Sequence, residues 1–319
     1  ALAAGCSLIL KAPEDTPSGA FQVARVFQEA GLPDGVLNVV HGGRETVEAM
    51  CDHPDIVGVS FVGSSHVAKI VHTRASASGK RVQALGGAKN YMIVLPDADM
   101  DVALEACSGS IFGSTGQRCL AGSVIVGVGY AHAQIRDRML DSAASIRLGD
   151  GLQPGTDMGP LISAAHRDRV NAFIDQGVSD GAKLSLDGRG ATVEGLEGGY
   201  WVGATVFADV PPDVSIATEE VFGPVAGINR AKDIDEAIRM MHASRYGNAC
   251  SIFTTSGKAA REFRYQAGIS MIGVNIGVAA PMAFFPFGGS KGSFYGDLKA
   301  QGRDGIFFYT DQRVVISRW

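Results

Sequence analysis

Hydrophobic and polar positions over the first 87 residues alternate between short apolar runs and longer amphipathic stretches. The apolar runs predict strands at 7–10, 36–40, 56–63 and 80–87. The amphipathic stretches predict helices at 16–30, 45–51 and 64–76. Thr16 stands at the expected N-cap of the first helix, and Pro17 at its first helical position. Strands and helices that alternate at this spacing favour parallel β–α–β units, the beginnings of a dinucleotide-binding fold.

Beyond residue 87 the same alternation continues in longer units. Strands are expected at 91–95 and 123–128, and helices at about 101–112, 132–146 and 165–180. A loop rich in Gly, Pro and Asp occupies 149–160, and the alternation then resumes as far as residue 275. The closing stretch GIFFYTDQRVVISRW alternates apolar and polar positions, like a strand that pairs with the edge of a sheet. The sequence therefore predicts an α/β protein, and its length favours two domains.

Composition narrows the choice of partner. The 319-residue chain is 46% hydrophobic and 19% charged, and its net charge of −5 is not offset by any basic block. Nucleic acid is therefore not an expected partner. A membrane is not expected either, because no apolar run reaches the roughly 18 to 20 residues that span a bilayer. A small-molecule substrate fits this composition best.

The five cysteines are Cys6, Cys51, Cys107, Cys119 and Cys250. Their number is odd, and they show neither a CxxC pair nor a Cys/His spacing typical of zinc. We therefore expect free thiols in a reducing, intracellular compartment and no metal site. The compartment would be the cytoplasm in a bacterium or the mitochondrial matrix in a eukaryote.

The stretch GSTGQRCLAG, residues 113–122, sets Cys119 apart from the other four cysteines. A buried cysteine is most often only a small hydrophobic side chain, and that explanation stays open here. Against it, the adjacent Arg118 favours a thiolate, and the glycines let the main chain approach a ligand closely. A thiolate is a strong nucleophile, so Cys119 is the candidate catalytic residue.

Two further motifs are weaker. FVGSS, residues 61–65, runs from a strand through Gly into a helix start, where backbone N–H groups and the Ser64 hydroxyl can hold a phosphate. Most such turns only cap a helix. LKAPE places Lys11 and Glu14 at the carboxyl end of a strand, where open α/β sheets bind ligands, although such side chains are usually just solvated.

The motifs FVGSS, ALGGAKN, GQRCLA, EEVFGPV and FGGSKGSFYGD occur in this order, and together they resemble the NAD(P)-dependent aldehyde dehydrogenase superfamily from end to end of the chain. CDHPDI (51–56), GKRVQALGGAKN (79–90) and the closing FYTDQRVVISRW are similar to one branch, the CoA-acylating methylmalonate-semialdehyde dehydrogenases. The resemblance implies a Rossmann-like cofactor domain and an α/β catalytic domain. It assigns 1–86 to the C-terminal part of the NAD-binding domain and 87–290 to the catalytic domain. It assigns 291–319 to a return segment and a strand that joins an oligomerisation sheet in a dimer or tetramer.

The same resemblance implies a role for individual residues. Cys119 matches the nucleophile, and its own N–H would supply half of an oxyanion hole. Phe287 would line the aldehyde funnel, and Arg118 would bind the substrate carboxylate unless it pairs with a structural acid instead. The cofactor NAD would be held by six residues: Lys11 and Glu14 on the adenosine ribose, Ser64 on the pyrophosphate, Leu85, and Glu220 and Phe222 on the nicotinamide ribose.

Two positions depart from the family pattern. KAPE stands where KPSE or KPAE is usual, although Lys11 and Glu14 keep their spacing. Ala84 stands where hydrolytic members carry a glutamate that activates water to release the acyl group. Ala84 is either a tolerated core alanine or a sign that water is not the acyl acceptor. The second alternative agrees with a CoA-dependent branch.

The sequence enters in mid-helix, and we expect the first part of the cofactor domain to be missing, together with the asparagine that supplies the side-chain oxyanion donor. The predicted reaction is NAD-dependent oxidative decarboxylation of malonate or methylmalonate semialdehyde to acetyl-CoA or propanoyl-CoA, with coenzyme A as co-substrate. One alternative is a hydrolytic aldehyde dehydrogenase of another substrate class. The other is a non-catalytic binding protein that keeps the fold.

Overall fold

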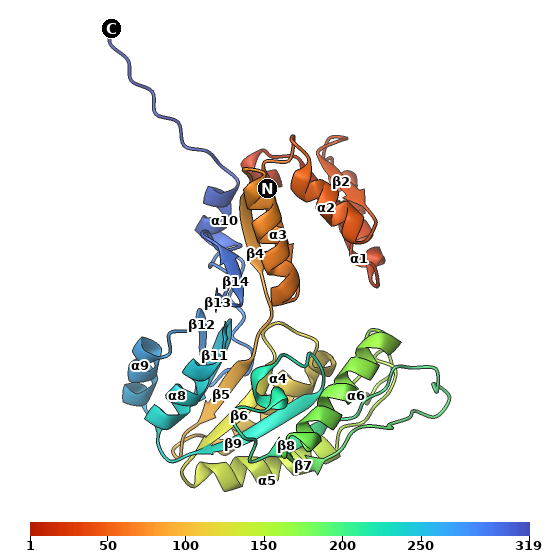
Figure 1. Cartoon of the computed structure of the whole chain (residues 1–319), viewed down its shortest axis with the longest axis vertical. Helices are drawn as coiled ribbons and strands as arrows, with labels where there is room; N and C mark the ends of the chain where they lie inside the picture. The colour runs from red at the N-terminus through yellow and green to blue at the C-terminus, as the bar shows by residue number, and fades with distance from the viewer. The chain divides into compact units, whose positions relative to one another are not determined.

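The computed structural model describes residues 1–319, and the chain divides into two compact units. The first unit comprises Ala1–Gly86, Pro281–Gly288 and Phe294–Trp319, and the second comprises Gly87–Ala280 and Gly289–Ser293. The chain therefore returns to the first unit after it has built the second. Both units alternate strands and helices (Figure 1), which confirms the predicted α/β class. The functions expected of 1–86, 87–290 and 291–319 stay predictions.

The first unit contains two small sheets. In one, β1 (Leu8–Lys11) and β2 (Leu37–Val40) pair in parallel. In the other, β4 (Arg81–Leu85) lies between the parallel β3 (Gly58–Val62) and the antiparallel β14 (Phe294–Gly296), which comes from the returning chain. The helices of this unit are η1 (Leu2–Ala4), α1 (Pro17–Glu29), α2 (Arg44–Asp52), α3 (Ser65–Ala77) and α10 (Gly302–Phe308).

The helix starts follow the sequence signals. Thr16 is the N-cap of α1 and Pro17 its first residue, as predicted, although the Thr16 side chain makes no capping hydrogen bond. Ser64 is the N-cap of α3, and its Oγ accepts a hydrogen bond from the N–H of Val67 at 3.4 Å. One apolar cluster then joins α2, α3 and β4, with Cys51 and Ala84 both buried in it.

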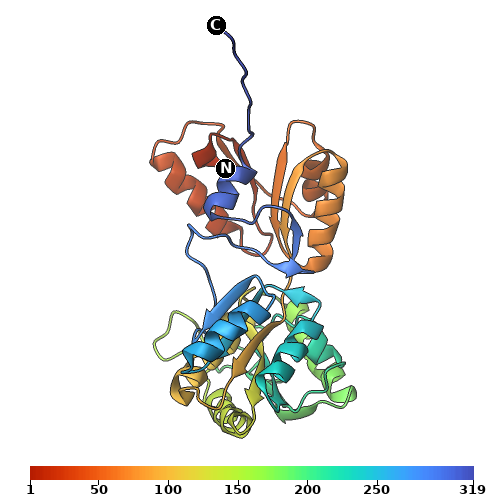
Figure 2. The ribbon, with the colours of Figure 1, turned by 90° about the vertical axis from the view of Figure 1, so that its left-hand side faces the viewer.

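The prediction of a strand is wrong for the start of the closing fifteen residues, and the strand that would join an oligomerisation sheet stays a prediction. Its first part folds as α10, and no regular structure follows Tyr309. Figures 1 and 2 show this tail running away from α10, with Val314, Val315 and Ile316 exposed. A strand needs a neighbour for its ladder of hydrogen bonds, and the chain places none beside these residues.

The second unit is organised around a seven-stranded sheet with the order β12–β11–β5–β6–β9–β8–β7. All neighbours in it are parallel except the antiparallel pair β7 and β8. In chain order the strands are β5 (Asn90–Val94), β6 (Gly122–Val128), β7 (Lys183–Leu186), β8 (Thr205–Ala208), β9 (Val225–Ala231), β11 (Ala249–Phe253) and β12 (Met271–Val274). A separate short pair joins β10 (Tyr246–Gly247) to β13 (Ser290–Lys291).

Helices cover both faces of this sheet, so its central strands are buried on both sides. Met92 and Val94 of β5 pack against α4 (Met100–Phe112) and α5 (Ala131–Ala144), and the alternate Tyr91 and Ile93 pack against α8 (Ile234–Ala243) and α9 (Gly257–Gln266). A third cluster joins α6 (Ala164–Ser179) and α7 (Ser215–Thr218) to β8 and β9. The predicted elements at 91–95, 101–112, 123–128, 132–146 and 165–180 are all confirmed to within two residues.

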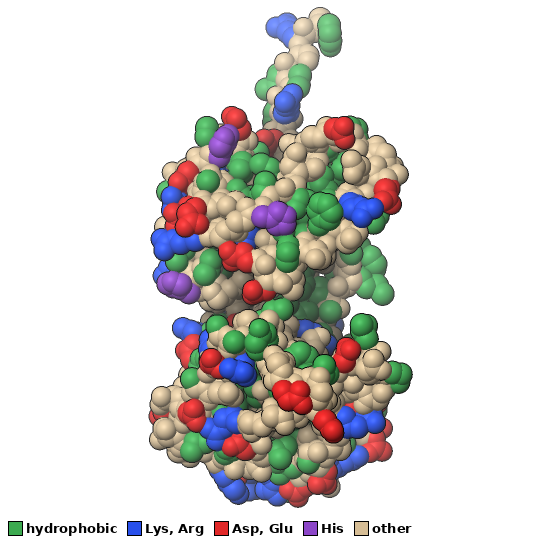
Figure 3. Space-filling model, turned by 90° about the vertical axis from the view of Figure 1, so that its right-hand side faces the viewer, with side chains coloured by type: hydrophobic (Ala, Val, Ile, Leu, Met, Phe, Trp, Pro, Cys, Tyr) green, Lys and Arg blue, Asp and Glu red, His purple; other side chains and the backbone are tan.

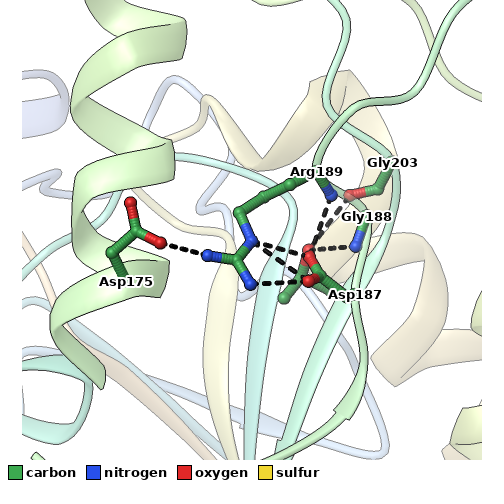
Figure 4. A network of polar contacts seen from close by, with 6 residues as sticks. Asp175, Asp187, Gly188, Arg189 and Gly203 are labelled. Atoms are coloured by element: carbon green, nitrogen blue, oxygen red, sulfur yellow. Dashed lines mark hydrogen bonds and ion pairs between the residues drawn. The ribbon is translucent and has the colours of Figure 1, made fainter. Parts of the chain in front are cut away.

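A polar network fixes α6 against the connection between β7 and β8 (Figure 4). The Arg189 guanidinium lies between Asp187 on that connection and Asp175 on α6 and forms ion pairs with both carboxylates. The N–H of Gly203 donates to the carbonyl of Gly188 at 2.7 Å, which ties the two sides of the connection together. The network matters for the site because α6 carries two side chains that hold the segment around Glu220.

The surface agrees with the modest net charge. On the face drawn in Figure 3, acidic and basic side chains are interspersed among polar and apolar ones. None of the helices has the length and apolar composition that crossing a membrane requires.

Candidate active site

A strained turn delivers Cys119 to the start of β6. Helix α4 runs into η2 (Gly113–Gly116), where Ser114, Thr115 and Gly116 all have positive φ. Two consecutive non-glycine residues in the left-handed region are costly and persist only where the surroundings enforce them. Thr115 is buried and its Oγ1 donates to the Gly159 carbonyl at 2.9 Å. The turn is therefore held in place, and the five residues after it carry the chain to β6.

Gly116 is required by a close approach. A Cβ at this position would collide with the carbonyl of Gly223, in the segment that precedes β9. The Cys119 loop and the 219–223 segment thus lie with their backbones in contact. The cavity left between them measures about 20 Å³, which is room for about one water molecule.

The Cys119 thiol is half-buried, and its nearest polar influences are backbone N–H groups. Burial raises the pKa of this thiol, the N–H groups of Cys119 and Leu120 lower it, and the negative charge of Glu220 raises it further. Arg118 has no part in this balance, so the expectation that it favours the thiolate is wrong. The physical reason is the direction in which its guanidinium points.

Arg118 turns back toward the end of α4. Its Nη2 donates to the carbonyls of Gly109 and Ser110 at 2.6 and 2.9 Å, and its Nε is buried without a partner. A cation there satisfies carbonyl groups that a helix C-terminus leaves without intrahelical donors. Arg118 contacts helix carbonyls and not a carboxylate, so the alternative that it pairs with a structural acid is also not observed. Its role toward a substrate carboxylate stays a prediction.

Glu220 lies against the turn that precedes β5. Its Oε1 accepts a hydrogen bond from the Ala88 N–H at 3.0 Å. Burial raises the pKa of Glu220, whereas this hydrogen bond and the charges of Arg169, Lys89 and Arg245 lower it. A Cβ at Gly87 would lie within 3.0 Å of the Glu220 Oε2, closer than real Cβ atoms come. Gly87 therefore makes the room in which this carboxylate sits.

Two side chains of α6 hold the backbone around Phe222. The Arg169 Nη2 donates to the Glu220 carbonyl at 3.2 Å, and the His166 Nε2 lies 2.7 Å from the Phe222 carbonyl. Phe222 itself has φ of 59°, a conformation that a bulky residue adopts only under constraint. The predicted pair Glu220 and Phe222 is thus presented on a firmly fixed segment.

Lys89 is a buried cation in this site that the sequence analysis quoted only as part of a motif. Its Nζ donates to the carbonyls of Ile216 and Glu219, at 2.7 and 2.9 Å. Burial lowers the pKa of Lys89 to about 8, and the charges of Glu220 and Glu219 oppose that change. A buried ammonium is rare unless it is paired or hydrogen-bonded. Here the buried Lys89 ammonium links the start of β5 to the 216–220 segment.

The remaining predicted cofactor residues belong to the first unit. Leu85 ends β4 and its carbonyl accepts from the Gly63 N–H at 3.0 Å, so Leu85 and Ser64 flank one turn. Lys11 ends β1. Glu14 lies near the start of α2, since a Cβ at Gly43 would fall 2.7 Å from its Oε1. The structure brings Leu85 and Ser64 near one another and places Lys11 at the end of β1 and Glu14 on the loop that follows it.

Two other predicted positions are also in the first unit. Phe287 forms an isolated antiparallel bridge with Ala300. Ala84 is completely buried in the apolar cluster of α2, α3 and β4. A methyl group there can take no proton, so neither explanation of Ala84 is removed. No group of three or more His, Cys, Asp or Glu side chains is arranged to hold a metal ion.

Comparison with known proteins decides the family. The model of the aldehyde dehydrogenase family matches residues 1–315. The chain belongs to this family. Its relatives include malonate-semialdehyde dehydrogenase 3 of Geobacillus kaustophilus, which is 47% identical over the whole chain, and malonate-semialdehyde dehydrogenase 1 of Oceanobacillus iheyensis, which is 46% identical. The chain spans only 66% and 65% of these two relatives.

Solved structures confirm the aldehyde dehydrogenase fold. The methylmalonate-semialdehyde dehydrogenase of Oceanimonas doudoroffii superposes with a TM-score of 0.96 at 42% identity, over 98% of this chain and 64% of that one. An aldehyde dehydrogenase of Mycobacterium tuberculosis, solved in complex with NAD+, superposes with a TM-score of 0.90 at 35% identity, over 97% of this chain and 63% of that one. The predicted resemblance and fold class are therefore confirmed.

This aldehyde dehydrogenase chain also holds two residues that the sequence analysis missed as part of the site. Asn90 and Asn248 both donate to the carbonyl of Cys119. Asn90 lies inside the ALGGAKN motif, and Asn248 precedes β11, one strand of the general α/β alternation. A polar residue directly before a buried strand was the available signal.

Proposed function

We propose that this chain is the nucleophile-bearing part of an NAD-dependent, CoA-acylating aldehyde dehydrogenase that acts on malonate and methylmalonate semialdehyde. The observation that carries the proposal is Cys119, which directly follows an enforced turn and whose thiol pKa is lowered by the N–H groups of Cys119 and Leu120. The names of its relatives, which are malonate- and methylmalonate-semialdehyde dehydrogenases, support the substrate class.

In the proposed reaction the Cys119 thiolate attacks the aldehyde carbon and forms a carbon–sulfur bond. The carbonyl oxygen becomes an alkoxide, which the N–H of Cys119 would stabilise. NAD, when bound, supplies the chemistry of hydride acceptance, so that the aldehyde is oxidised to a thioester on Cys119. A thioester next to a carboxylate group releases CO2 and takes up a proton, which leaves an acetyl or propanoyl group on the sulfur.

The chain fits NAD at the residues that the resemblance assigned. Gly87 leaves space for the Glu220 carboxylate, which the Ala88 N–H orients, and this pair would hold the ribose next to the reacting ring. In the first unit, Ser64 caps α3, whose N-terminus favours an anionic group. Glu14 would accept hydrogen bonds from a ribose and repel a 2′-phosphate, so NAD should be preferred to NADP.

Coenzyme A is the proposed acyl acceptor. Release of an acyl group to water needs a positioned base, which typically contributes 10²–10⁴-fold, and Ala84 offers none. A thiol attacks a thioester without such help, because a modest thiolate fraction suffices. Turnover should therefore depend on CoA.

The test is product analysis on the complete protein with malonate semialdehyde and NAD, in the presence and absence of CoA. We expect slow turnover without CoA, and faster turnover with accumulation of acetyl-CoA when CoA is added. Rapid release of free acid without CoA would instead identify a hydrolytic enzyme. Absence of any reaction between the aldehyde and Cys119, judged by mass spectrometry against a Cys119→Ser control, would identify a non-catalytic binding protein.

A further inference from the structure

The carbonyl oxygen of the nucleophile is held by two buried amides. The Nδ2 of Asn90 donates to the Cys119 carbonyl at 3.0 Å, and the Nδ2 of Asn248 donates to the same oxygen at 2.8 Å. Both side chains are buried, with 3% and 5% of their surfaces exposed. Asn90 begins β5 and Asn248 immediately precedes β11, so the two amides come from the ends of neighbouring strands.

The orientation of the Asn90 amide follows from its complete set of partners. Besides Cys119, its Nδ2 donates to the Ala121 carbonyl at 2.9 Å, and its Oδ1 accepts from the Ala249 N–H at 3.0 Å. Exchange of the oxygen and nitrogen would set an acceptor against two carbonyls and a donor against an N–H. Asn90 therefore ties β11, β5 and the Cys119 loop together in one arrangement.

Holding this carbonyl also fixes the other side of the same peptide group. The Cys119–Leu120 peptide is planar and trans, so its N–H points opposite to its C=O. With the oxygen held by two amides, the Leu120 N–H is fixed on the opposite side of the same peptide group, and this N–H lowers the pKa of the Cys119 thiol. Donors on the carbonyl also polarise the peptide and strengthen its N–H as a donor.

We propose that Asn90 and Asn248 are positioning residues for the nucleophile, which hold the Cys119–Leu120 peptide, and with it the thiol and the Leu120 N–H, in one orientation. The inference rests on the proposed function of Cys119. It adds a reason why this thiol reacts although burial and Glu220, the charged group that acts on it, both disfavour the thiolate. Arg118, which the sequence suggested for this task, is engaged at the end of α4 instead.

Asn248 is the better residue to change, because Asn90 also supports β11 and Ala121. Asn248→Leu keeps the approximate size and removes the donor. Asn229→Leu is a matched control, because Asn229 is also buried, with 6% exposed, and its Oδ1 accepts from the Val210 N–H rather than contacting Cys119. Asn248→Ser is a second variant should the leucine prevent folding, since its hydroxyl is too short to replace the amide.

The measurement is the rate at which iodoacetamide alkylates Cys119 in the complete protein, as a function of pH, with the rate of the Cys119→Ser variant subtracted. We expect Asn248→Leu to react about three- to tenfold more slowly at neutral pH. The reason is that the thiolate loses stabilisation comparable to the contribution of one hydrogen bond. At high pH, where the thiol is fully ionised, its rate should equal that of the wild type. The control should follow the wild-type profile throughout.

An unchanged pH profile in folded Asn248→Leu or Asn248→Ser would overturn the inference. So would an equal shift in Asn229→Leu, because it would show a general effect of losing a buried amide. The assay uses neither aldehyde nor NAD. Failure of the proposed reaction, seen as absence of turnover in the wild type, is therefore distinguishable from failure of this inference.

Discussion

Gly87→Ala adds a single methyl group next to the Glu220 carboxylate and should displace it. The new Cβ would fall within 3.0 Å of the Glu220 Oε2 and 3.1 Å from the Glu220 Cδ, whereas the nearest atom of another residue, a ring carbon of Tyr246, is at 3.5 Å and in ordinary contact. Gly87 does not have a positive φ, so alanine causes no backbone strain there. The carboxylate, as the end of a flexible side chain, is the group that must move.

The expected loss follows from the hydrogen bond that this movement breaks. The Ala88 N–H donates to Glu220 at 3.0 Å, and a hydrogen bond to a charged group contributes about 1.5–3 kcal/mol. If Glu220 holds the nicotinamide ribose, the displaced carboxylate loses a hydrogen bond of the same kind to that ribose, and at about 1.4 kcal/mol for each factor of ten NAD affinity should fall by about ten- to a hundredfold. The free energy of unfolding should fall by at most about the same 1.5–3 kcal/mol, because the broken hydrogen bond lies within the protein while the backbone and the core stay in place.

The assay is titration of the complete protein with NADH, followed by nicotinamide fluorescence, together with urea unfolding of the same samples. Gly198→Ala serves as the control, because a Cβ at Gly198 meets no heavy atom within 4 Å. In a Glu220→Ala background the effect of Gly87→Ala should disappear, since no carboxylate is left to displace. Wild-type affinity in the single variant would refute the placement of Glu220 on the cofactor.

Three further predictions concern neighbouring residues. Cys119→Ser should abolish turnover and leave NADH binding intact, whereas Cys107→Ser, in the apolar core, should keep turnover; an active Cys119→Ser would end the assignment. Arg118→Leu should raise the KM for malonate semialdehyde more than that for propanal, and equal increases would limit Arg118 to its contacts with α4. The pKa of Lys89 is about 8 in the folded protein, against an ordinary value of 10.5. Between pH 8 and pH 10.5 the unfolded chain therefore binds more protons than the folded chain. The free energy of unfolding then rises with pH over this range, by up to about 3 kcal/mol. Lys89→Met should remove that rise in urea unfolding, and identical slopes would contradict it.

Local pattern predicted the elements of the second unit because their own side chains decide them. After Asn90 the run Tyr91–Val94 is apolar, and both of its faces are in fact buried. The tail failed for the opposite reason. Alternation within 305–319 is compatible with a strand, but a strand also needs a partner, and that partner is a property of the whole assembly of segments. Arg118 failed similarly, because sequence adjacency to Cys119 does not determine where a long side chain points.

The position of the site explains why its supporting residues were missed. In open α/β sheets, ligands commonly bind at the carboxyl ends of the strands, and Lys11 and Glu14 drew attention for that reason. In the second unit the polar residues gather at the opposite ends: Cys119 precedes β6, Glu220 precedes β9, and Asn248 precedes β11. The parallel pairing of Cys250 with Tyr91 is what brings Asn248 beside Asn90, across 158 positions of sequence. The sequence pattern of either segment alone does not determine how the two strands pair. It follows that the nucleophile could be found from its own motif, whereas the amides that hold it could be found only from the sheet.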